Sequence, residues 1–396
     1  DQGTKKGVFC LVGDGDNSPR VWLYHSRSTE PFEIFYGGGE NQSCQKKLVP
    51  ANHSSNAAGY SFGKNHGTLD MTIGTGAELG GHGVYCLVGD PYHYNSKGAC
   101  WIFGSGSDNN GTSLFQKSFN GHTTTGLPTF GRSVSIVSGS DSVYCMVGAP
   151  AYSSPSRGYI NLFKSTGDVK HEIKNPGYPN AFTGGGDEYG QAVSLHSSSY
   201  GFVCAASAPH FDEVDAGGTD NNGATFITSL PSRRYGTIGR PGTYDVVYAS
   251  YTDGDTYASS SMDGVIIAAG SPKDSVKSRL FASNAATLNS VGSVQLFYSG
   301  SRWGTTTKEV NIYNSSGDRN NLDFFGSRVS ICNNSTLPHQ KFYIASTAYP
   351  TDASGIWQGE SRKSGAISVF SGSIIEETGT PVIQATKTFE INDHYF

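Results

Sequence analysis

The stretch FGRSVSIVSGSDSVYCMVGAP, residues 130–150, decides the fold. Its two runs of β-branched and aromatic residues are separated by Gly-Ser-Asp and stopped by Ala-Pro, a pattern typical of two short strands joined by a tight turn. Related phrases return along the chain as VFCLVG (8–13), VYCLVG (84–89), FVCAAS (202–207) and GVIIAAG (264–270). The hairpin is therefore a repeating unit of the molecule.

Six such units account for the chain. The small residue that closes the repeated phrase recurs at Gly13, Gly89, Gly148, Ser207, Gly270 and Ser346. Each unit holds about four short runs with strand-like alternation, and one such sheet cannot bury both of its faces alone. We therefore predict an all-β protein, a six-bladed β-propeller of four-stranded antiparallel blades, formed by residues 1–396 as a single domain.

The two ends of the sequence suggest how such a ring closes. The last residues, INDHYF (391–396), end in an aromatic residue where other units begin with Phe-Gly or Tyr-Gly. We expect the termini to meet in one blade; the alternative is that residues 1–6 form an inner strand by themselves. The expected role of the repeated glycine is close approach near the crowded axis, and the proline that often follows ends a strand where no ladder donor is needed.

Composition agrees with many short strands and excludes some partners. The chain has 52 glycines, 15% charged residues and a net charge of -5 at pH 7, without a Lys/Arg run. We therefore do not expect nucleic acid as a partner. No apolar stretch approaches the roughly 20 residues of a membrane helix, so membrane insertion is not expected. The sequence begins at Asp1 without a charged and apolar leader, so no secretion signal is expected within it.

The aromatic-glycine pairs and the Val-Gly steps together resemble the FG-GAP repeats of integrin α-subunit β-propellers. The pairs and steps that carry the resemblance are Phe62-Gly63, Phe130-Gly131, Tyr189-Gly190, Phe325-Gly326, Val88-Gly89, Val147 to Pro150, Ala208-Pro209 and Ser271-Pro272. The resemblance implies an extracellular protein that binds a ligand and takes part in cell adhesion. Integrin propellers have seven blades and this chain has six units, so the partners of integrins are not carried over.

The resemblance also implies calcium in D-x-D-x-D-G loops between the first two strands of a blade. Here those loops are SGSDS (138–142) and HSSSY (196–200). They offer too few carboxylates for a cation that takes six to eight oxygen ligands. We therefore predict no cofactor, with calcium left open.

Loop length indicates where a binding site lies. In an up-and-down blade the 2–3 and 4–1 connections share one face, and on that face 37–59, 210–222, 273–291 and 349–364 are longer than a turn requires. Loops held by a rigid scaffold commonly carry binding, and aromatic rings beside charged groups suit a glycan or a protein ligand. The predicted ligand-binding residues are Tyr92, His93, Tyr94, Tyr152, His210, Asp212, Glu213, Arg279, Trp357 and Arg362. The alternative is that these are ordinary polar loops whose aromatic residues cover the rim of the core.

Three classes of function remain. We favour a non-catalytic recognition or adhesion module, and the second reading is a structural subunit that assembles into a particle or filament. The third is a sialidase-like glycoside hydrolase or viral attachment head, for which Arg132 and Arg328 would bind a substrate carboxylate. The S-x-D-x-G-x-T-W, G-x-S-x-G and H-E-x-x-H motifs are missing, so the sequence favours no enzyme.

Cysteines and sequons point to different compartments. Cys10, Cys86, Cys145 and Cys204 occupy one position of successive repeats, too far apart to pair, and are expected to be buried thiols. Six N-x-S/T acceptor sequences favour secretion in a eukaryote; their asparagines are Asn41, Asn52, Asn110, Asn314, Asn333 and Asn334. We expect an extracellular or particle-surface location, and the thiols leave an intracellular one open.

Overall fold

A computed structural model of the 396-residue chain confirms the all-β prediction. It describes residues 9–13, 21–25, 45–48, 62, 69–76, 81–93, 97–105, 114–120, 129–150, 158–175, 187–198, 201–209, 224–230, 234–239, 248–253, 265–271, 293–299, 307–312, 325–326, 329–333, 341–348, 366–377 and 380–392. The chain divides into two compact units, 1–172 and 173–396. The elements named within the described residues are all strands, and every strand pairing between them is antiparallel.

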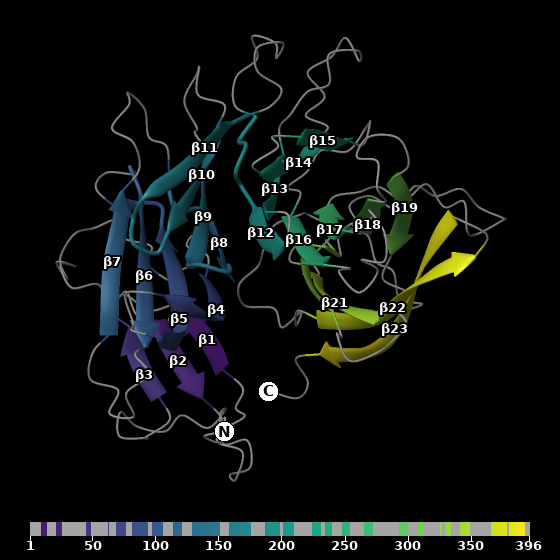
Figure 1. The fold of residues 1–396 in the computed structure, drawn as a ribbon. Coiled ribbons are helices and arrows are strands. Elements are labelled where there is room, and N and C mark those ends of the chain that lie inside the picture. The colour runs from purple at the N-terminus through teal and green to yellow at the C-terminus, as the bar shows by residue number, and fades with distance from the viewer. Residues whose placement is uncertain are drawn as a thin grey trace, which may run out of the picture. The chain divides into compact units, whose positions relative to one another are not determined.

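Unit 1 contains three sheets, each a meander of consecutive strands (Figure 1). The first has three strands, β1 (Phe9–Gly13), β2 (Val21–His25) and β3 (Gln45–Leu48). The second has β4 (Leu69–Gly76), β5 (Gly81–Asp90), β6 (Ala99–Ser105) and β7 (Leu114–Asn120). The third has β8 (Ser133–Ser138), β9 (Val143–Ala149), β10 (Tyr159–Lys164) and β11 (Val169–Lys174), which reaches the unit boundary.

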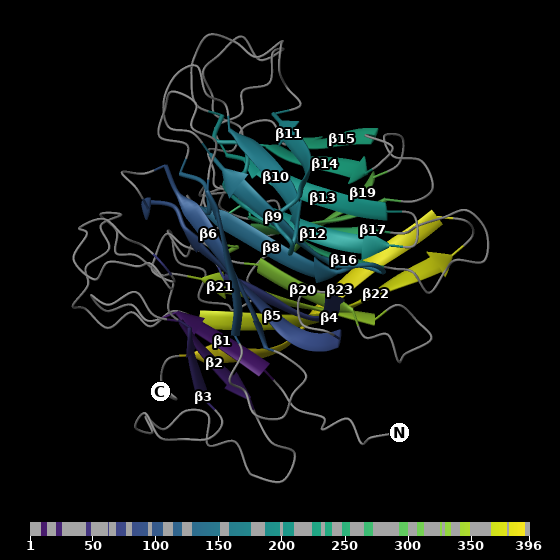
Figure 2. The same cartoon turned by 60° about the vertical axis from the view of Figure 1, so that its left-hand side comes forward.

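Unit 2 contains three four-stranded meanders (Figure 2). They are β12 (Val193–Ser198), β13 (Gly201–Ala208), β14 (Ala224–Leu230) and β15 (Arg234–Gly239); then β16 (Tyr248–Asp253), β17 (Val265–Ser271), β18 (Ser293–Ser299) and β19 (Thr307–Ile312). The last is β20 (Val329–Asn333), β21 (Lys341–Ala348), β22 (Ala366–Glu377) and β23 (Thr380–Asn392). The β22–β23 ribbon continues past β21, since Ile374 to Glu377 pair only with β23 among the described strands.

One detail of the strand prediction is wrong. β3 lies at Gln45–Leu48, inside the range 37–59 that the sequence analysis treats as a loop. It is the outer strand of its sheet, and it pairs with β2. In unit 2, the fourth strand of the β12–β15 sheet is β15, and Tyr248 to Ser250 belong to the next sheet as part of β16.

The aromatic residue of the aromatic-glycine pair has the same buried place in four of the six sheets. Phe62, Phe130, Tyr189 and Phe325 are all fully buried. Each packs edge-on against an aromatic ring of the third strand of its own sheet, with ring centroids 5.6 to 6.0 Å apart: Phe103, Phe163, Phe226 and Phe370 respectively. The aromatic ring that precedes the first strand therefore holds the start of each of these sheets against its third strand.

The glycine after the aromatic residue has a backbone that other residues rarely adopt. Gly131, Gly190 and Gly326 have φ values of 91°, 95° and 93°. The N–H of Gly131 donates to the carbonyl of Gly148 over 3.0 Å, and the N–H of Gly190 donates to Ser207 over 2.8 Å. The turn is thereby bonded to the small residue that closes the second strand of its own sheet.

The Val-Gly step has the role that the sequence predicts, close backbone approach. A Cβ atom added to Gly89 would fall on the carbonyl oxygen of Gly131, and one added to Gly270 would fall on that of Gly326. In both cases the second strand of one sheet lies against the aromatic-glycine turn that opens the next sheet. We call this contact the glycine seat. It brings the backbone of the β4–β7 sheet against that of the β8–β11 sheet, and the backbone of the β16–β19 sheet against that of the β20–β23 sheet.

Candidate functional site

Two of the predicted ligand-binding residues fall on described residues, Tyr92 and His93 in the connection after β5. The other eight lie outside them: Tyr94, Tyr152, His210, Asp212, Glu213, Arg279, Trp357 and Arg362. Arg328 also lies outside the described residues, so no pairing with Arg132 can be described. These assignments stay predictions.

His93 is an interior residue of its loop. It is 4% exposed, its Nδ1 lies 3.5 Å from Oδ2 of the fully buried Asp90, and its ring packs edge-on against Trp101 with centroids 5.8 Å apart. Its carbonyl accepts the N–H of Gly98 over 2.9 Å, which closes the loop. His93 thus anchors the loop against Trp101 of β6. Tyr92 is half-buried and Lys97 is exposed.

The next sheet begins beside this loop. The N–H of Phe130 donates to the carbonyl of Lys97 over 3.3 Å, and Oγ1 of Thr129 donates to the carbonyl of Pro150 over 2.6 Å. Arg132, half-buried, follows two residues after Phe130. One backbone hydrogen bond and one from the Thr129 side chain therefore hold Lys97 and Pro150, at the ends of two 2–3 connections, against the turn at 129–132. We call Tyr92, Lys97 and Arg132 the loop-end group.

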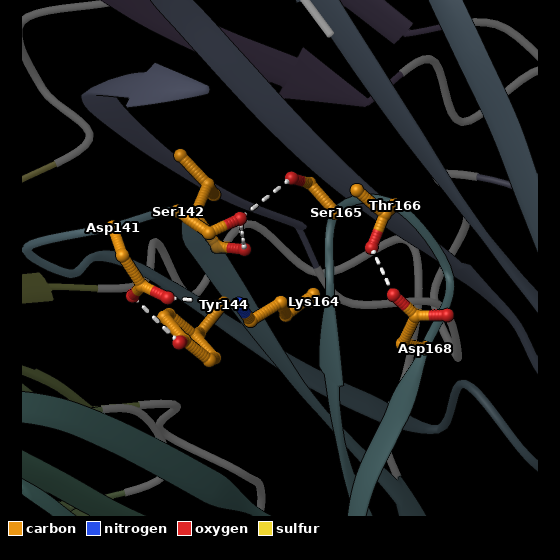
Figure 3. Close-up of polar contacts among 8 residues, drawn as sticks. Asp141, Ser142, Tyr144, Lys164, Ser165, Thr166 and Asp168 are labelled. Carbon is orange, nitrogen blue, oxygen red and sulfur yellow. Dashed lines mark hydrogen bonds and ion pairs between the residues drawn. The ribbon is translucent and has the colours of Figure 1, made fainter. Parts of the chain in front are cut away.

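The opposite end of the β8–β11 sheet carries a compact charged cluster (Figure 3). The Tyr144 hydroxyl donates to Oδ1 of Asp141 over 2.7 Å, and Nζ of Lys164 lies 2.8 Å from Oδ2 of the same carboxylate. The hydrogen bond from Lys164 lowers the pKa of Asp141 below its usual range, and burial together with Asp141 raises the pKa of Tyr144. Carboxylate and ammonium satisfy each other, so the cluster stabilises two turns.

Hydroxyl groups lie beside this cluster. Ser142 and Ser165, both buried, have their Oγ atoms 3.4 Å apart, and Oγ of Ser142 also donates to the carbonyl of Val143 over 3.4 Å. Thr166 donates to Asp168 over 2.8 Å (Figure 3). Sequence reasoning had a signal for this cluster in the two short turns SGSDS (138–142) and STGD (165–168), but it weighed only the first, as a calcium loop.

Asp70 is a carboxylate that the sequence analysis does not single out. Although the residue keeps some exposure, its Oδ2 accepts the N–H of Ile136 and its Oδ1 that of Met71, both over 2.8 Å. The carboxylate therefore ties β4 of one sheet to β8 of the next. Burial raises its pKa to about 6, against the opposing effect of these bonds and of Ser135.

Among the described residues, no group of three or more His, Cys, Asp or Glu side chains is arranged to hold a metal ion. The same residues include no helix whose length and apolarity would suit a membrane span. Of the six sequon asparagines, Asn333 is the last residue of β20, opposite Phe342, and the others lie outside the described residues.

Five cysteines in the described residues are free thiols. Cys10 is one of them, and the other four are buried: Cys86, Cys100, Cys145 and Cys204. Burial raises the pKa of Cys86 and of Cys204 to about 12 and that of Cys100 well above its usual value. Cys10, at the equivalent position of β1, is partly exposed.

This difference makes thiol labelling a direct check of the repeat. Because the thiolate is the reactive species and must be reached by solvent, we expect a water-soluble maleimide to modify Cys10 in the native protein. The four buried thiols should react on the order of a hundredfold more slowly. Peptide mass spectrometry after labelling, with the unfolded protein as the reference in which all cysteines react, measures both. Fast native labelling of Cys86 or Cys204 would contradict the burial described above.

Comparison with known proteins adds no relative. A search of protein-family models finds none that matches the chain, and a search of curated proteins finds no similar sequence.

Proposed function

We propose that the six sheets form one six-bladed β-propeller. Three observations support it: the sheets are consecutive meanders, glycine seats join neighbours, and the first strands of neighbouring sheets lie in contact, β4 with β8 in unit 1 and β12 with β16 and β16 with β20 in unit 2. Val12 of β1 and Ile367 of β22 are 43% and 41% exposed, whereas their counterparts in the second sheet, Val88 and Cys100, are fully buried. Closure of the ring would cover both side chains.

We propose further that this propeller is a non-catalytic recognition module that binds a glycan or a protein ligand at the loop end of its sheets. The observation that carries this proposal is the asymmetry of the connections. In the β12–β15 sheet, two residues separate β12 from β13 and three separate β14 from β15, whereas the connection between β13 and β14 spans 209–223. In the β16–β19 and β20–β23 sheets the same 2–3 connection spans 272–292 and 349–365.

The loop-end group supplies suitable chemistry at that end. Tyr92, Lys97 and Arg132 offer an aromatic face and cationic donors, which suit hydroxyl-rich or carboxylate-bearing ligands. Arg132 belongs to the turn at 129–132, and the carbonyl of Lys97 accepts the N–H of Phe130 from that turn, so the backbone of these two residues requires little ordering on binding. Two sheets depart from this asymmetry. In the first sheet the 3–4 connection, 26–44, is also long, and in the β4–β7 sheet the 2–3 connection, 91–98, is no longer than the 3–4 connection, 106–113.

A glycan array probed with and without a chelator, followed by a panel of extracellular proteins, tests the function. We expect a saturable ligand whose affinity falls about tenfold or more in the double variant Tyr92→Ala and Lys97→Ala. Lys164→Ala, at the opposite end of the β8–β11 sheet, is the matched control and should bind as the wild type. Equal loss in the control, or hydrolysis of a bound glycan, would remove the basis of this proposal.

A further inference from the structure

Two sheets of unit 1 have a cationic residue at the same place, two residues before the third strand. Lys97 precedes Gly98 and β6, and Arg157 precedes Gly158 and β10. The two glycines have nearly the same backbone conformation, with φ values of 80° and 82°. In the other four sheets the residue at this place is uncharged: Pro19, Asn222, Val291 and Ser364. The cation therefore belongs to these two sheets and is not required by the repeat.

The connections that carry these cations are bonded to one turn. The carbonyl of Lys97 accepts the N–H of Phe130 over 3.3 Å, and Oγ1 of Thr129 donates to the carbonyl of Pro150 over 2.6 Å. Pro150 begins the connection that contains the second cation, and the connection after β7 leads directly into Thr129. Three connections of the loop end therefore begin or end beside the same turn: 91–98, 121–128 and 150–158.

These connections and the turn between them contain no acidic residue, although the whole chain has a net charge of -5 at pH 7. Their cationic residues are Lys97, Arg132 and Arg157. The 2–3 connections of the other four sheets each contain at least one Asp or Glu, and 209–223 contains four. The carboxylate that adjoins the first connection, Asp90, is fully buried and lies 3.5 Å from Nδ1 of His93. Charge complementarity therefore favours an anionic ligand at this turn.

The neutral residues of the three connections suit a sugar better than a peptide. Apart from proline and alanine, Leu127 is their one aliphatic residue. A bound peptide is usually anchored by apolar side chains in well-packed pockets. The connections are instead rich in Tyr, Ser, Thr and Asn, in the stretches YHYNS (92–96), TTT (123–125) and YSSPS (152–156). Aromatic rings give a sugar ring an apolar face to pack against, and hydroxyl and amide groups match its hydroxyls.

We infer that the loop-end group, together with Arg157, binds an anionic glycan whose carboxylate or sulfate groups contact the cationic side chains. A guanidinium group binds either anion through paired N–H donors, and an ammonium group adds a point charge. Lys97 is exposed, and no ion pair joins it to another described residue. This inference rests on the proposed recognition function and narrows its ligand, because neutral glycans and proteins are no longer the preferred class.

Two matched pairs of glycans test the charge by isothermal titration calorimetry on the full chain. Sialyllactose is compared with its carboxyl-reduced form, and a heparin tetrasaccharide with the same oligosaccharide after desulfation. The charged member of at least one pair should bind at least about tenfold more tightly than its partner, because hydrogen bonds to charged groups are the stronger ones. The pair that responds identifies carboxylate or sulfate as the recognised group. Raising the NaCl concentration from about 0.05 M to about 0.5 M should weaken this binding several-fold.

Single charge-removing variants locate the contact. Lys97→Gln and Arg157→Gln should each weaken binding of the charged glycan about tenfold and change binding of its less charged partner less than about twofold. Lys164→Gln is the matched control, since it removes one cation at the opposite end of the β8–β11 sheet, where Lys164 contacts Asp141. It should bind the charged glycan as the wild type does. Circular dichroism establishes that all three variants fold.

Failure of this inference and failure of the recognition proposal give different results. A neutral glycan or a protein that loses affinity in the double variant Tyr92→Ala and Lys97→Ala would leave the recognition proposal standing and overturn this one. Equal weakening by Lys164→Gln, or tighter binding of a glutamate octapeptide than of either charged glycan, would also overturn it. Absence of any saturable ligand would overturn both.

Discussion

Replacing Gly131 by alanine is expected to lower the free energy of unfolding by about 3 to 5 kcal/mol. Two costs combine. The φ value of 91° is one that residues with a Cβ rarely adopt, and the added Cβ would fall on the carbonyl oxygen of Ala99. Both the turn and the neighbouring β6 would have to move. Urea denaturation followed by tryptophan fluorescence measures the loss.

Gly167→Ala separates the two costs. Gly167 also has a positive φ, 98°, but it lies in the half-exposed turn between β10 and β11. Only backbone strain is expected there, about 1 kcal/mol. If both variants lost the same free energy, close packing at the glycine seat would not be what makes Gly131 necessary.

The second large effect is the dependence of stability on pH through Asp70. Its pKa is raised in the folded protein to about 6 from an ordinary value of 3.8, so the folded state binds the proton more tightly than the unfolded state does. The contribution of Asp70 to the free energy of unfolding therefore becomes more favourable as the pH falls from about 7 toward 4. By linkage the full difference is about 3 kcal/mol. Above pH 6 the ionised carboxylate carries the whole cost of its burial.

The comparison of wild type with Asp70→Asn isolates this term, because asparagine does not titrate. The difference in unfolding free energy between the two proteins should change by about 2.4 kcal/mol between pH 7.5 and pH 4, in favour of the wild type at the lower pH, because the unfolded carboxyl is only partly protonated at pH 4. Denaturant titrations at several pH values give this difference directly, and other carboxylates cancel.

Asp141→Asn is the control with the opposite sign. The ammonium of Lys164 lowers the pKa of Asp141, so its stabilising effect is present at neutral pH and is lost on acidification. Because Asp141 is 56% exposed, this effect should be small. A pH-independent difference for Asp70→Asn would show that the carboxylate is not titrating between pH 4 and 7.5.

The sequence predicts the strands of this fold where alternating apolar residues are bounded by Gly and Pro turn residues. β8 and β9 occupy the two runs of the stretch 130–150, and Gly89 makes the close approach expected of the Val-Gly step. The strand prediction fails where the local pattern is weak. β3, with the sequence QKKL, has no apolar alternation, and its pairing of Leu48 with Val21 is a tertiary contact that no local rule contains.

The candidate site was harder to predict for a related reason. His93 is predicted as a ligand contact because it is a polar residue in a loop, and no local pattern indicates that it packs against Trp101 and Asp90. Asp70 is the second residue of β4, and its bond to Ile136 spans 66 residues. Sequence spacing identifies which residues share a strand, but it does not reveal which neighbouring sheet a side chain meets.

The glycine seat also limits how a chain of this kind can grow or shrink over evolution. A loop can lengthen freely because neither partner of a seat is moved, as the connections 209–223 and 272–292 illustrate. Loss or gain of part of a repeat would leave a Gly89-type residue facing the wrong backbone. Duplications and deletions should therefore be tolerated only when they add or remove a complete repeat, from one glycine seat to the next. Loop length can vary without this restriction.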